Sequence, residues 1–555
     1  MGAGVNAKRP SARLSVLLAG AAAVHLACVA APAFAQSPSG WTDPPVGSAA
    51  PMAQPDAAVR AALRESYLAG HGSHETASFY RDRGYAPLWT AGGAVRPEAR
   101  RLAEVLTQDG ADREHELLSA LEAAEGSDAV ALARAEIALS DALAARRAPA
   151  GEADGGLAFI DTEIAPVWLG GAKALEAAAK ASSLATFVDE ASRRNPLQEA
   201  LSKGLERYRA SWGSLPEVKV AAGPVLAAGA TGVRVKQLRR RLGLPEAGAY
   251  DTDLEAAVSN FQAAHGLAVS GRADAATLAA LNAGPWRYEQ MILASLERAK
   301  ALPPSLGERY ILVNAPAGEL KLYDGGQMVK RMKVVVGKPT LPTPMMAGVL
   351  RYAVFNPYWN VPEDLVQTTI AHRVLTQGLG YLDADGMEVF ESYEPDARKL
   401  DPAAVDWRGV AAGTVSVRVR QKPGPKNMMG QVKLAFPNPL GIYLHDTPMK
   451  ELFGLDQRTA SSGCVRLEDA MALTELLMDG EAEALKAAAA NPETPAPLPK
   501  AVPVYITYLT AEPTEDGFIF RPDVYGRDKA WSAQLARRHA AEQAQAQAGV
   551  TENAG

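Results

Sequence analysis

The sequence predicts a multidomain α+β protein, with a helical scaffold first, a small three-helix module next and a β-rich domain carrying an insertion last. The length of 555 residues exceeds a single ordinary core, because domains take about 150 residues each. Apolar residues recur at helical spacing up to about residue 284 and alternate with a period of two after it. With 48% hydrophobic and 22% charged residues, the composition is that of a globular protein.

Residues 1–35 have the pattern of a cleaved export signal. Basic residues precede an apolar run, and small residues end it: Lys8, Arg9 and Arg13, then residues 14–29, then Ala33 to Ala35. The run is interrupted by His25 and is shorter than the roughly 20 residues of a comfortable membrane span. We therefore expect export across the inner membrane, cleavage after Ala35 and no membrane span afterwards. A retained anchor and lipidation of Cys28 are the alternatives.

The net charge and the number of cysteines limit the classes of function that we expect. Removal of the signal takes away three basic side chains and moves the net charge from −6 to −9, which gives no indication of nucleic-acid binding. It also leaves Cys464 as the only cysteine, so no intramolecular disulfide can form. A lone thiol outside the cytoplasm is easily oxidised, which favours a chemical role for it. The alternative is a small buried apolar residue.

Changes of composition and period give the expected domains. These are a signal at 1–35, a flexible leader at 36–56, a helical scaffold at 57–222, the small module at 223–284, a helical connection at 285–308, the β-rich domain at 309–526 and a tail at 527–555. Residues 131–139 are typical of the scaffold, with alanine and leucine at helical spacing. We expect the tail to be a frayed helix or disordered.

Period-two segments predict the strands of the β-rich domain, at residues 310–313, 319–323, 328–336, 352–355, 432–436, 442–444, 502–508 and 518–520. The second and third are joined by a turn at 324–326. Residues 363–430 are a capping insertion, expected to be an ordered lid because structureless loops of this length are rare. Its basic residues face either solvent or substrate carboxylates: Arg418, Arg420, Lys422 and Lys426.

The chemistry centres on Cys464, which follows His445 by nineteen residues and has Gly463 before it. An ordinary thiol, with a pKa of about 8.5, is mostly protonated at neutral pH, and a neighbouring imidazole would lower that pKa and take the proton. Residues 467–477 have the pattern of an amphipathic helix, whose start would stabilise a thiolate. The amides of that start and of Gly463 are candidates for an oxyanion hole.

The His445…Ser461-Ser462-Gly463-Cys464-Val465-Arg466 pattern resembles the L,D-transpeptidase family with the YkuD catalytic domain. Residues 229–238 and 261–267 resemble a three-helix peptidoglycan-binding module. Further stretches look like the large periplasmic, YcbB-like branch of the family: residues 313–316, 335–340, 355–362 and 443–448. The resemblance covers nearly all of residues 60–526. One departure is Ser462, where many members have a second histidine.

The resemblance implies a periplasmic enzyme of cell-wall biogenesis and cell shape that uses no cofactor and no metal. Its substrates would be peptidoglycan tetrapeptide stems of the meso-diaminopimelate type. Cys464 would attack the carbonyl between the L-centre of diaminopimelate and the terminal D-alanine, and D-alanine would leave a thioester behind. The side-chain amine of a second stem would then form a 3→3 cross-link.

The family's remaining roles carry over only to matching positions. The backbone carbonyl of Asp446 would orient His445. Arg466 would pair with a stem carboxylate or brace the cysteine loop, because a guanidinium fork suits carboxylates. Tyr443 and Ser462 would line the substrate site, although Tyr443 fits a packing role nearly as well.

Several other functions use similar residues. Papain-like and NlpC/P60 peptidases place the cysteine before the histidine, and sortases separate the two much further. Water as the acyl acceptor would give an L,D-carboxypeptidase, or a hydrolase that releases wall-linked groups, and the sequence leaves that choice open. A non-catalytic wall-binding protein would lack the histidine or the cysteine, and both are present. The module at 223–284 could also position the catalytic domain instead of binding glycan.

Overall fold

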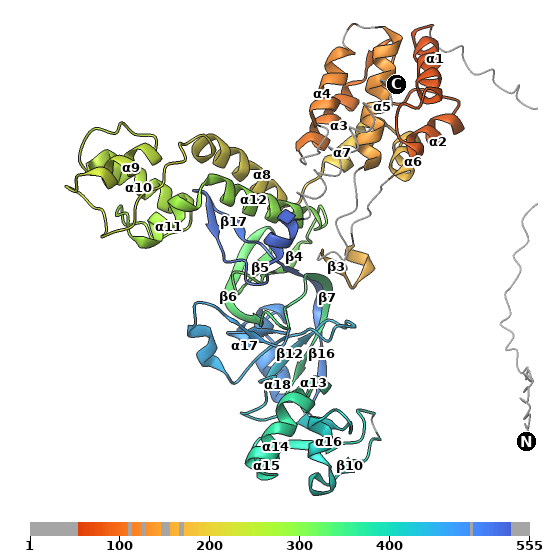
Figure 1. Cartoon of the computed structure of the whole chain (residues 1–555). Helices are drawn as coiled ribbons and strands as arrows, with labels where there is room; N and C mark the ends of the chain where they lie inside the picture. Colours follow the sequence, from red (N-terminus) through yellow and green to blue (C-terminus); the bar gives the residue numbers. More distant parts are fainter. Residues whose placement is uncertain are drawn as a thin grey trace, which may run out of the picture. The chain divides into compact units, whose positions relative to one another are not determined.

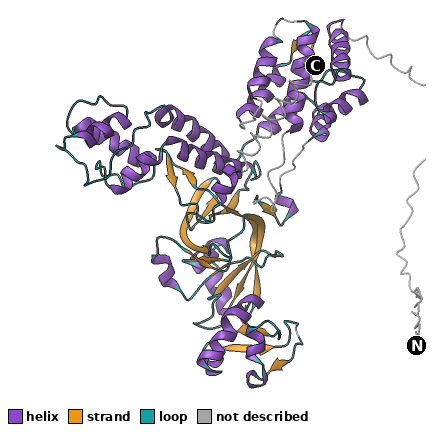
Figure 2. Cartoon of the chain, viewed as in Figure 1, coloured by secondary structure: helices purple, strands orange, loops and turns teal. Residues whose placement is uncertain are grey.

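The computed structural model describes residues 54–108, 114–124, 126, 128–145, 156–165, 171–394, 396–488 and 492–533 (Figure 1). The expected export signal, the leader up to residue 53 and the tail from residue 534 lie outside these ranges. Within them, no helix combines the length and the apolar character that crossing a membrane requires. Helices dominate the first half of the described chain and strands the second, as expected from the sequence (Figure 2).

The N-terminal region is largely helical. Its helices are α1 (Gln54–Leu68), α2 (His74–Asp82), α3 (Pro97–Gln108), α4 (Glu114–Ala123), α5 (Ala129–Ala145), α6 (Ala172–Lys180) and α7 (Leu184–Ser192). Leucine and alanine side chains form its core, and the buried carboxylate of Glu136 accepts hydrogen bonds from Tyr80 Oη and from the backbone N–H of Trp89. The region is not purely helical, because β1 (Thr90–Ala91) and β2 (Ala94–Val95) pair as a short hairpin.

The small module contains the three predicted helices, α9 (Val233–Arg241), α10 (Thr252–Ala264) and α11 (Ala275–Ala283). Asp251 and Asp274 cap the second and third by accepting backbone N–H groups, which fixes where each begins. Two helices flank the module in sequence and pack against each other: α8 (Pro196–Tyr208), which continues into a π-helical turn, and α12 (Pro285–Lys300).

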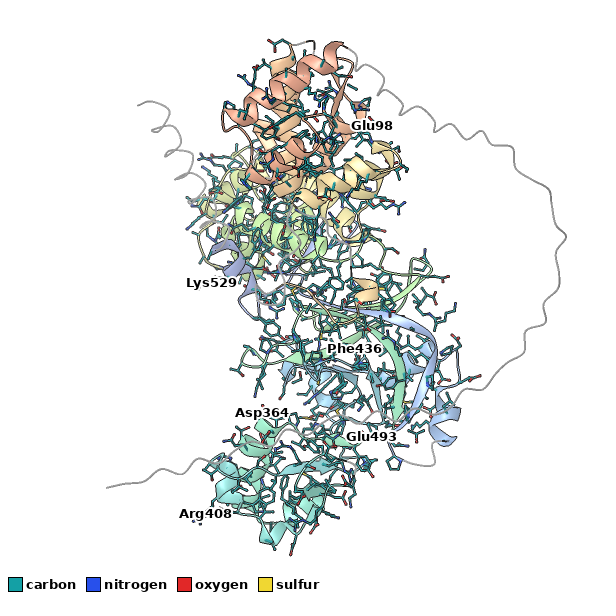
Figure 3. The ribbon with its side chains drawn as sticks, turned by 90° about the vertical axis from the view of Figure 1, so that its right-hand side faces the viewer. Glu98, Asp364, Arg408, Phe436, Glu493 and Lys529 are labelled. Atoms are coloured by element: carbon teal, nitrogen blue, oxygen red, sulfur yellow. The ribbon has the colours of Figure 1, made fainter. Side chains whose placement is uncertain are left out.

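The β-rich domain is built on one large sheet in the order β12-β13-β15-β6-β5-β4-β16-β7-β3. Its main strands are β4 (Arg309–Asn314), β5 (Glu319–Asp324), β6 (Gln327–Gly337), β7 (Met346–Phe355), β12 (Val432–Ala435), β13 (Leu444–His445), β15 (Val465–Leu467) and β16 (Thr494–Thr507). Because β12 also pairs with β7, the sheet closes on itself around an apolar core that includes Phe436, labelled in Figure 3. Helices α17 (Ala470–Leu477) and α18 (Ala482–Ala488) follow β15.

Two short strands take partners that the sequence did not indicate. Strand β3 (Ala158–Phe159) lies in the region predicted to be helical scaffold, yet it pairs with β7 and so joins the large sheet. Residues 518–520, predicted as a strand of the β-rich domain, form β18 (Phe518–Phe520), which pairs with β17 (Ala511–Pro513) and not with the large sheet. Both strands were too short for a period-two pattern to show which partner they would take. Phe518 packs tightly against Gly204 of α8, where a side chain would not fit.

The insertion is ordered and has an apolar core of its own. Its elements are α13 (Glu363–Leu365) with a π-helical turn, α14 (Ala371–Gln377), α15 (Gly380–Ala384), β9 (Met387–Phe390), β10 (Lys399–Leu400), α16 (Trp407–Ala411) and β11 (Arg418–Gln421), and β8 (Trp359–Asn360) joins its sheet. Figure 3 labels Asp364 and Arg408 within it. Of the four residues of its basic stretch at 418–426, three are paired inside the insertion: Arg418 with Glu363, Arg420 with Glu388 and Lys426 with Asp385.

Candidate active site

Neighbouring strands bring the histidine and the cysteine together. Strands β13 and β15 run parallel, with Leu444 opposite Val465 and His445 opposite Arg466. Cys464 is therefore the residue directly before β15, and it lies beside the strand that carries His445. The two residues are nineteen positions apart in the sequence, and the register sets their side chains on the same face of neighbouring strands, with Cys464 level with Tyr443.

Cys464 is a free, half-buried thiol. Its Sγ donates a weak hydrogen bond to the carbonyl of Gly441 at 3.5 Å. Burial raises the pKa of this thiol above its ordinary value, and the backbone of Tyr443 and the positive charges of Arg466 and Lys433 oppose that rise only in part. The expected lowering of the thiol pKa is therefore not found, because loss of hydration outweighs the nearby charges. At rest the cysteine is a thiol.

His445 is held in one tautomer. Its Nδ1 lies 2.5 Å from the backbone carbonyl of Asp446, and a carbonyl only accepts, so the proton is on Nδ1 and Nε2 has a free lone pair. Burial, assisted by the charge of Arg466, lowers the pKa of His445 to about 3, so the ring is neutral. No hydrogen bond joins the thiol and the imidazole anywhere in the described chain. The resting pair is neutral thiol and neutral imidazole.

Asp446 secures the carbonyl that orients His445. Its backbone N–H donates to Val432 O at 3.0 Å. Its buried carboxylate accepts from the N–H of Gln431 at 2.9 Å and pairs with Lys450 at 2.7 Å. The side chain thus fixes the residue, while the backbone carbonyl holds the ring.

The loop before Cys464 is tied by short polar contacts. Gly463 has φ +113°, a conformation that L side chains rarely adopt. Its N–H donates to Ser461 Oγ at 3.1 Å, and that hydroxyl donates to Cys464 O at 2.6 Å. The Gly463 amide is thus already bonded in this structure, and its predicted oxyanion role stays a prediction. Ser462 is exposed.

Two cations and an aromatic ring lie near the thiol. Arg466 is half-buried, its Nη1 lies 3.3 Å from Met449 Sδ, and its Nε is buried with no partner in the described chain. Lys433 stands opposite His445 in the β12–β13 ladder, with Nζ 5.1 Å from the ring centroid of Tyr443. No motif in the sequence marks Lys433 as a site residue. Strand pairing could have done so only if the register of β12 and β13 had been known.

The predicted helix after the cysteine begins later than expected. Residues 465–467 form β15, and α17 begins at Ala470 with Asp469 as its cap. Cys464 is therefore not at a helix start, and the expected stabilisation of a thiolate by a helix dipole was wrong. The amphipathic pattern was right for residues 470–477, but it did not show that the first residues complete a sheet.

Three family models match successive parts of the chain. The model described as "L,D-transpeptidase catalytic domain" (YkuD) matches residues 308–505, "Scaffold domain" matches 74–205 and "Putative peptidoglycan binding domain" matches 233–281. A Haemophilus influenzae protein named "Putative L,D-transpeptidase" is 30% identical over 244 residues, which are 43% of this chain and 48% of that protein. The chain thus spans about half the length of the curated relative it matches.

Solved structures of L,D-transpeptidases are also similar, at low identity. One from Mycobacterium smegmatis is 14% identical, over 36% of this chain and 58% of that one, with a TM-score of 0.18. One from Xylanimonas cellulosilytica is 17% identical, over 52% and 99%, with a TM-score of 0.17. These superpositions are too poor to bear on the site. The family models show the domain content: this chain carries a YkuD L,D-transpeptidase catalytic domain over residues 308–505, preceded by a scaffold domain and a peptidoglycan-binding domain.

Proposed function

We propose that the protein is an L,D-transpeptidase that forms 3→3 cross-links in peptidoglycan, with Cys464 as its nucleophile. The observation that carries this is the orientation of His445, whose Nδ1–H bond to Asp446 O leaves Nε2 free to act as a base. The β13–β15 register supports the proposal, because His445 lies opposite Arg466, two residues after Cys464, so that both side chains face the same side of the sheet. Meso-diaminopimelate tetrapeptide stems are the proposed substrates.

In the first half-reaction, the sulfur of Cys464 attacks the carbonyl that joins the L-centre of diaminopimelate to D-alanine. His445 Nε2 takes the thiol proton and then delivers it to the departing amide nitrogen, so D-alanine leaves as a neutral amine and a thioester remains. Because the thiol pKa is raised and that of His445 is about 3, an ion pair is unfavourable at rest. The proton therefore moves together with attack, once the thiol has turned from Gly441 toward the histidine.

In the second half-reaction, the side-chain amine of diaminopimelate on another stem attacks the thioester. His445 accepts the amine proton and returns it to the departing sulfur, which restores the thiol and completes the cross-link. The energy comes from the peptide bond that was cleaved, so no activated co-substrate enters. Water in place of the amine would give the L,D-carboxypeptidase, which is the alternative function.

The negative oxygen of each tetrahedral intermediate needs a hydrogen-bond donor. The backbone N–H of Cys464 has no acceptor within the described chain, and it adjoins the reacting sulfur. The N–H of Gly463 is bonded to Ser461 and could contribute only if that contact opened. We assign the first oxyanion bond to Cys464 N–H.

Arg466 and Lys433 give the site a positive character suited to stem carboxylates. The buried Nε of Arg466 has no partner in the described chain, so a carboxylate would satisfy it. Tyr443 would face the stem beside Lys433, and Ser462 is accessible for a further contact. The module at 223–284 would hold the enzyme on peptidoglycan, and the protein would act in the periplasm after export.

The test is incubation of the protein with disaccharide-tetrapeptide, followed by mass analysis of the products. A cross-linked dimer that has lost one D-alanine supports transfer, whereas disaccharide-tripeptide alone supports hydrolysis. Cys464→Ala should abolish both products, and Cys464→Ser should keep the fold and lose at least about 100-fold in rate, because a hydroxyl is a far weaker nucleophile. Full activity of Cys464→Ala would refute the mechanism.

A further inference from the structure

Strand β6 ends at Gly337, beside the cysteine loop, and its last residue does not complete the ladder with β15. Arg466 pairs with Val335 across the two antiparallel strands. The N–H of Val465 donates to Tyr443 O at 2.9 Å, so Val465 faces β13 and its neighbours on either side face β6. Bonded pairs recur at every second residue of an antiparallel ladder, so the next pair would be Cys464 with Gly337. Within the described chain no hydrogen bond joins them.

Two side-chain hydroxyls occupy the backbone groups of Gly337 instead. Its N–H donates to Thr343 Oγ1 at 2.8 Å, and its carbonyl accepts from Tyr525 Oη at 2.7 Å. The Thr343 hydroxyl then donates to the carbonyl of Gly463 at 2.7 Å, and the Thr343 N–H donates to Tyr525 Oη at 3.4 Å. The strand end, the residue before the cysteine and Tyr525 are thereby linked by four hydrogen bonds.

The residues that follow β6, up to Thr343, pack closely on Gly337, the last residue of that strand. A Cβ placed on Gly337 would lie 2.6 Å from the nitrogen of Thr343, which is closer than such atoms approach, so only glycine fits. Thr343 is fully buried. Its hydroxyl accepts one hydrogen bond and donates another, which fixes the direction of its proton. That proton is therefore not available to another acceptor.

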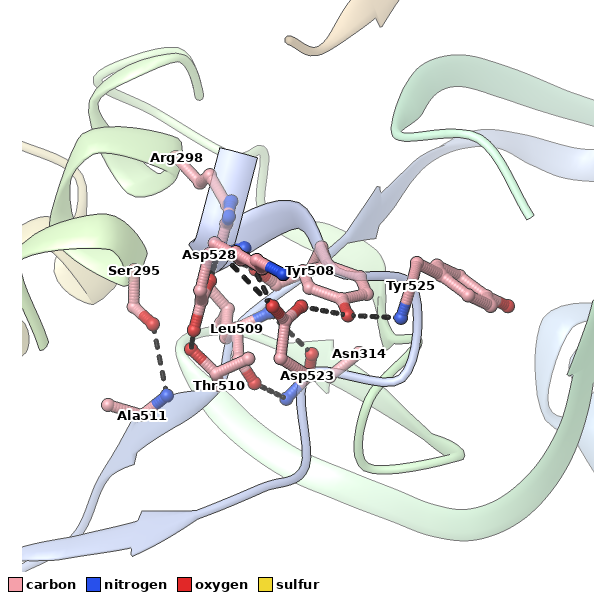
Figure 4. Close-up of polar contacts among 11 residues, drawn as sticks. Ser295, Arg298, Asn314, Tyr508, Leu509, Thr510, Ala511, Asp523, Tyr525 and Asp528 are labelled. Atoms are coloured by element: carbon pink, nitrogen blue, oxygen red, sulfur yellow. Dashed lines mark hydrogen bonds and ion pairs between the residues drawn. The ribbon is translucent and has the colours of Figure 1, made fainter. Parts of the chain in front are cut away.

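Tyr525 comes from beyond the catalytic family match, which ends at residue 505. Its backbone N–H donates to Tyr508 Oη at 2.8 Å, and Tyr508 Oη donates to Asp523 at 2.6 Å (Figure 4). Asp528 ties the same segment to helix α12 through Arg298, with 2.6 Å between Nη1 and Oδ1. The segment is therefore anchored independently of the cysteine loop, and it can hold Tyr525 still.

We propose that Tyr525 and Thr343 are positioning residues for Cys464, which keep its backbone N–H free for the oxyanion by occupying both polar groups of Gly337. Without the Tyr525 hydroxyl, the carbonyl of Gly337 becomes a vacant acceptor that faces Cys464 N–H, and the ladder can extend by one pair. The amide that the reaction needs would then be consumed by the sheet. The inference rests on the proposed function only for the identity of the natural substrate. Any carbonyl compound that Cys464 attacks forms an oxyanion and needs the same free N–H group.

The test compares two electrophiles on the full chain, with mass analysis of the peptide that contains Cys464. Iodoacetamide alkylates sulfur without forming an oxyanion, whereas p-nitrophenyl acetate acetylates it through a tetrahedral oxyanion. Tyr525→Phe and Thr343→Val should slow acetylation about tenfold or more and change alkylation less than twofold. Thr343→Ser, which keeps the hydroxyl, should behave as the native protein. Tyr505→Phe is the matched control, since it removes a hydroxyl bonded to another carbonyl, that of Leu306.

If these hydroxyls had a purely structural role, their removal would slow acetylation and alkylation by the same factor, and that result would overturn the inference. Unchanged rates in both reactions would overturn it as well. Near-ultraviolet circular dichroism establishes that each variant is folded. If Thr343→Val does not fold, the half-buried Tyr525 still gives the decisive variant. A native protein that makes no cross-links but loses acetylation in Tyr525→Phe would defeat the proposed function and leave this inference standing.

Discussion

Lys433 lies directly opposite His445 in the β12–β13 ladder, and its ammonium stands 5.1 Å from the ring centroid of Tyr443. Its other neighbour is the carboxylate of Glu493, at 3.8 Å, which is too distant for a strong pair. The charge therefore acts on the site itself. It favours the thiolate of Cys464 and disfavours a protonated His445.

Lys433→Gln should slow the alkylation of Cys464 at pH 8, because loss of the cation makes the thiol harder to ionise. We expect the alkylation rate to fall by up to about threefold relative to the native protein, and the pH profile of that rate to shift to higher pH. The measurement is iodoacetamide alkylation across pH 6 to 10. Lys203→Gln is the control, since it removes an exposed lysine of α8 that pairs with Glu199. Equal profiles for Lys433→Gln and the control would show that the cation does not reach the thiol.

The activity should persist at a pH where most histidine-dependent enzymes fail. The base must be neutral, and burial lowers the pKa of His445 to about 3, so its protonation begins well below pH 5. We therefore expect kcat/KM to be nearly flat from pH 7 down to pH 5. Steady-state rates measured alongside the folded fraction will decide this. A loss with a midpoint near pH 6.5 would mean that the imidazole is solvated in the working enzyme.

Arg466→Lys should weaken donor binding more than it affects turnover, because a lysine cannot offer two parallel N–H groups to a carboxylate. KM for the tetrapeptide donor should rise about tenfold or more. A donor whose terminal carboxylate is amidated tests whether Arg466 contacts that carboxylate. With this donor, the KM values of the native and variant enzymes should differ little. If the amidated donor shows the same tenfold difference, Arg466 braces the loop and does not contact that carboxylate.

His265 predicts how stability depends on pH. Burial among Phe261, Tyr208 and Trp212 lowers its pKa to about 4, with a small contribution from Arg241. The unfolded chain, with a histidine pKa near 6.5, takes up this proton first, so the stability due to the neutral ring is complete above pH 6.5 and is lost as the pH falls toward 4.

Between pH 7 and pH 5 the His265 site should therefore cost about 2 kcal/mol of unfolding free energy. His265→Phe removes the titrating group and should reduce the difference between the two pH values by that amount. Urea unfolding at both pH values measures it. An unchanged difference would place the acid sensitivity elsewhere, for example at His445, which among the described residues is also a buried histidine with a strongly lowered pKa.

The sequence alone was sufficient to propose the nucleophile and its base. Cys464 is the only cysteine left after the expected cleavage, and His445 stands at a distinctive distance before it, so a linear motif identifies both. Helical periodicity likewise predicted α5 and α9 to α11, because that signal is repeated over several turns. The hairpin between β5 and β6 followed from two glycines in a tight turn.

Other features depended on contacts between residues far apart in the chain. Strand β3, two residues long, takes its place only because β7 offers an edge, and residues 465–467 became a strand because β6 and β13 lie on either side. Lys433 enters the site through strand register. The thiol pKa is decided by burial, which no local pattern reports.

Cys464 shows most clearly which features the sequence determined and which the tertiary structure decided. Its identity, its histidine and its glycine are local properties, and the sequence determined them. Whether its backbone N–H is free depends on Gly337, Thr343 and Tyr525, which lie more than sixty residues away on either side. Hydrogen bonds between such distant groups exist only when the whole sheet is assembled, so the tertiary structure decided that part of the site.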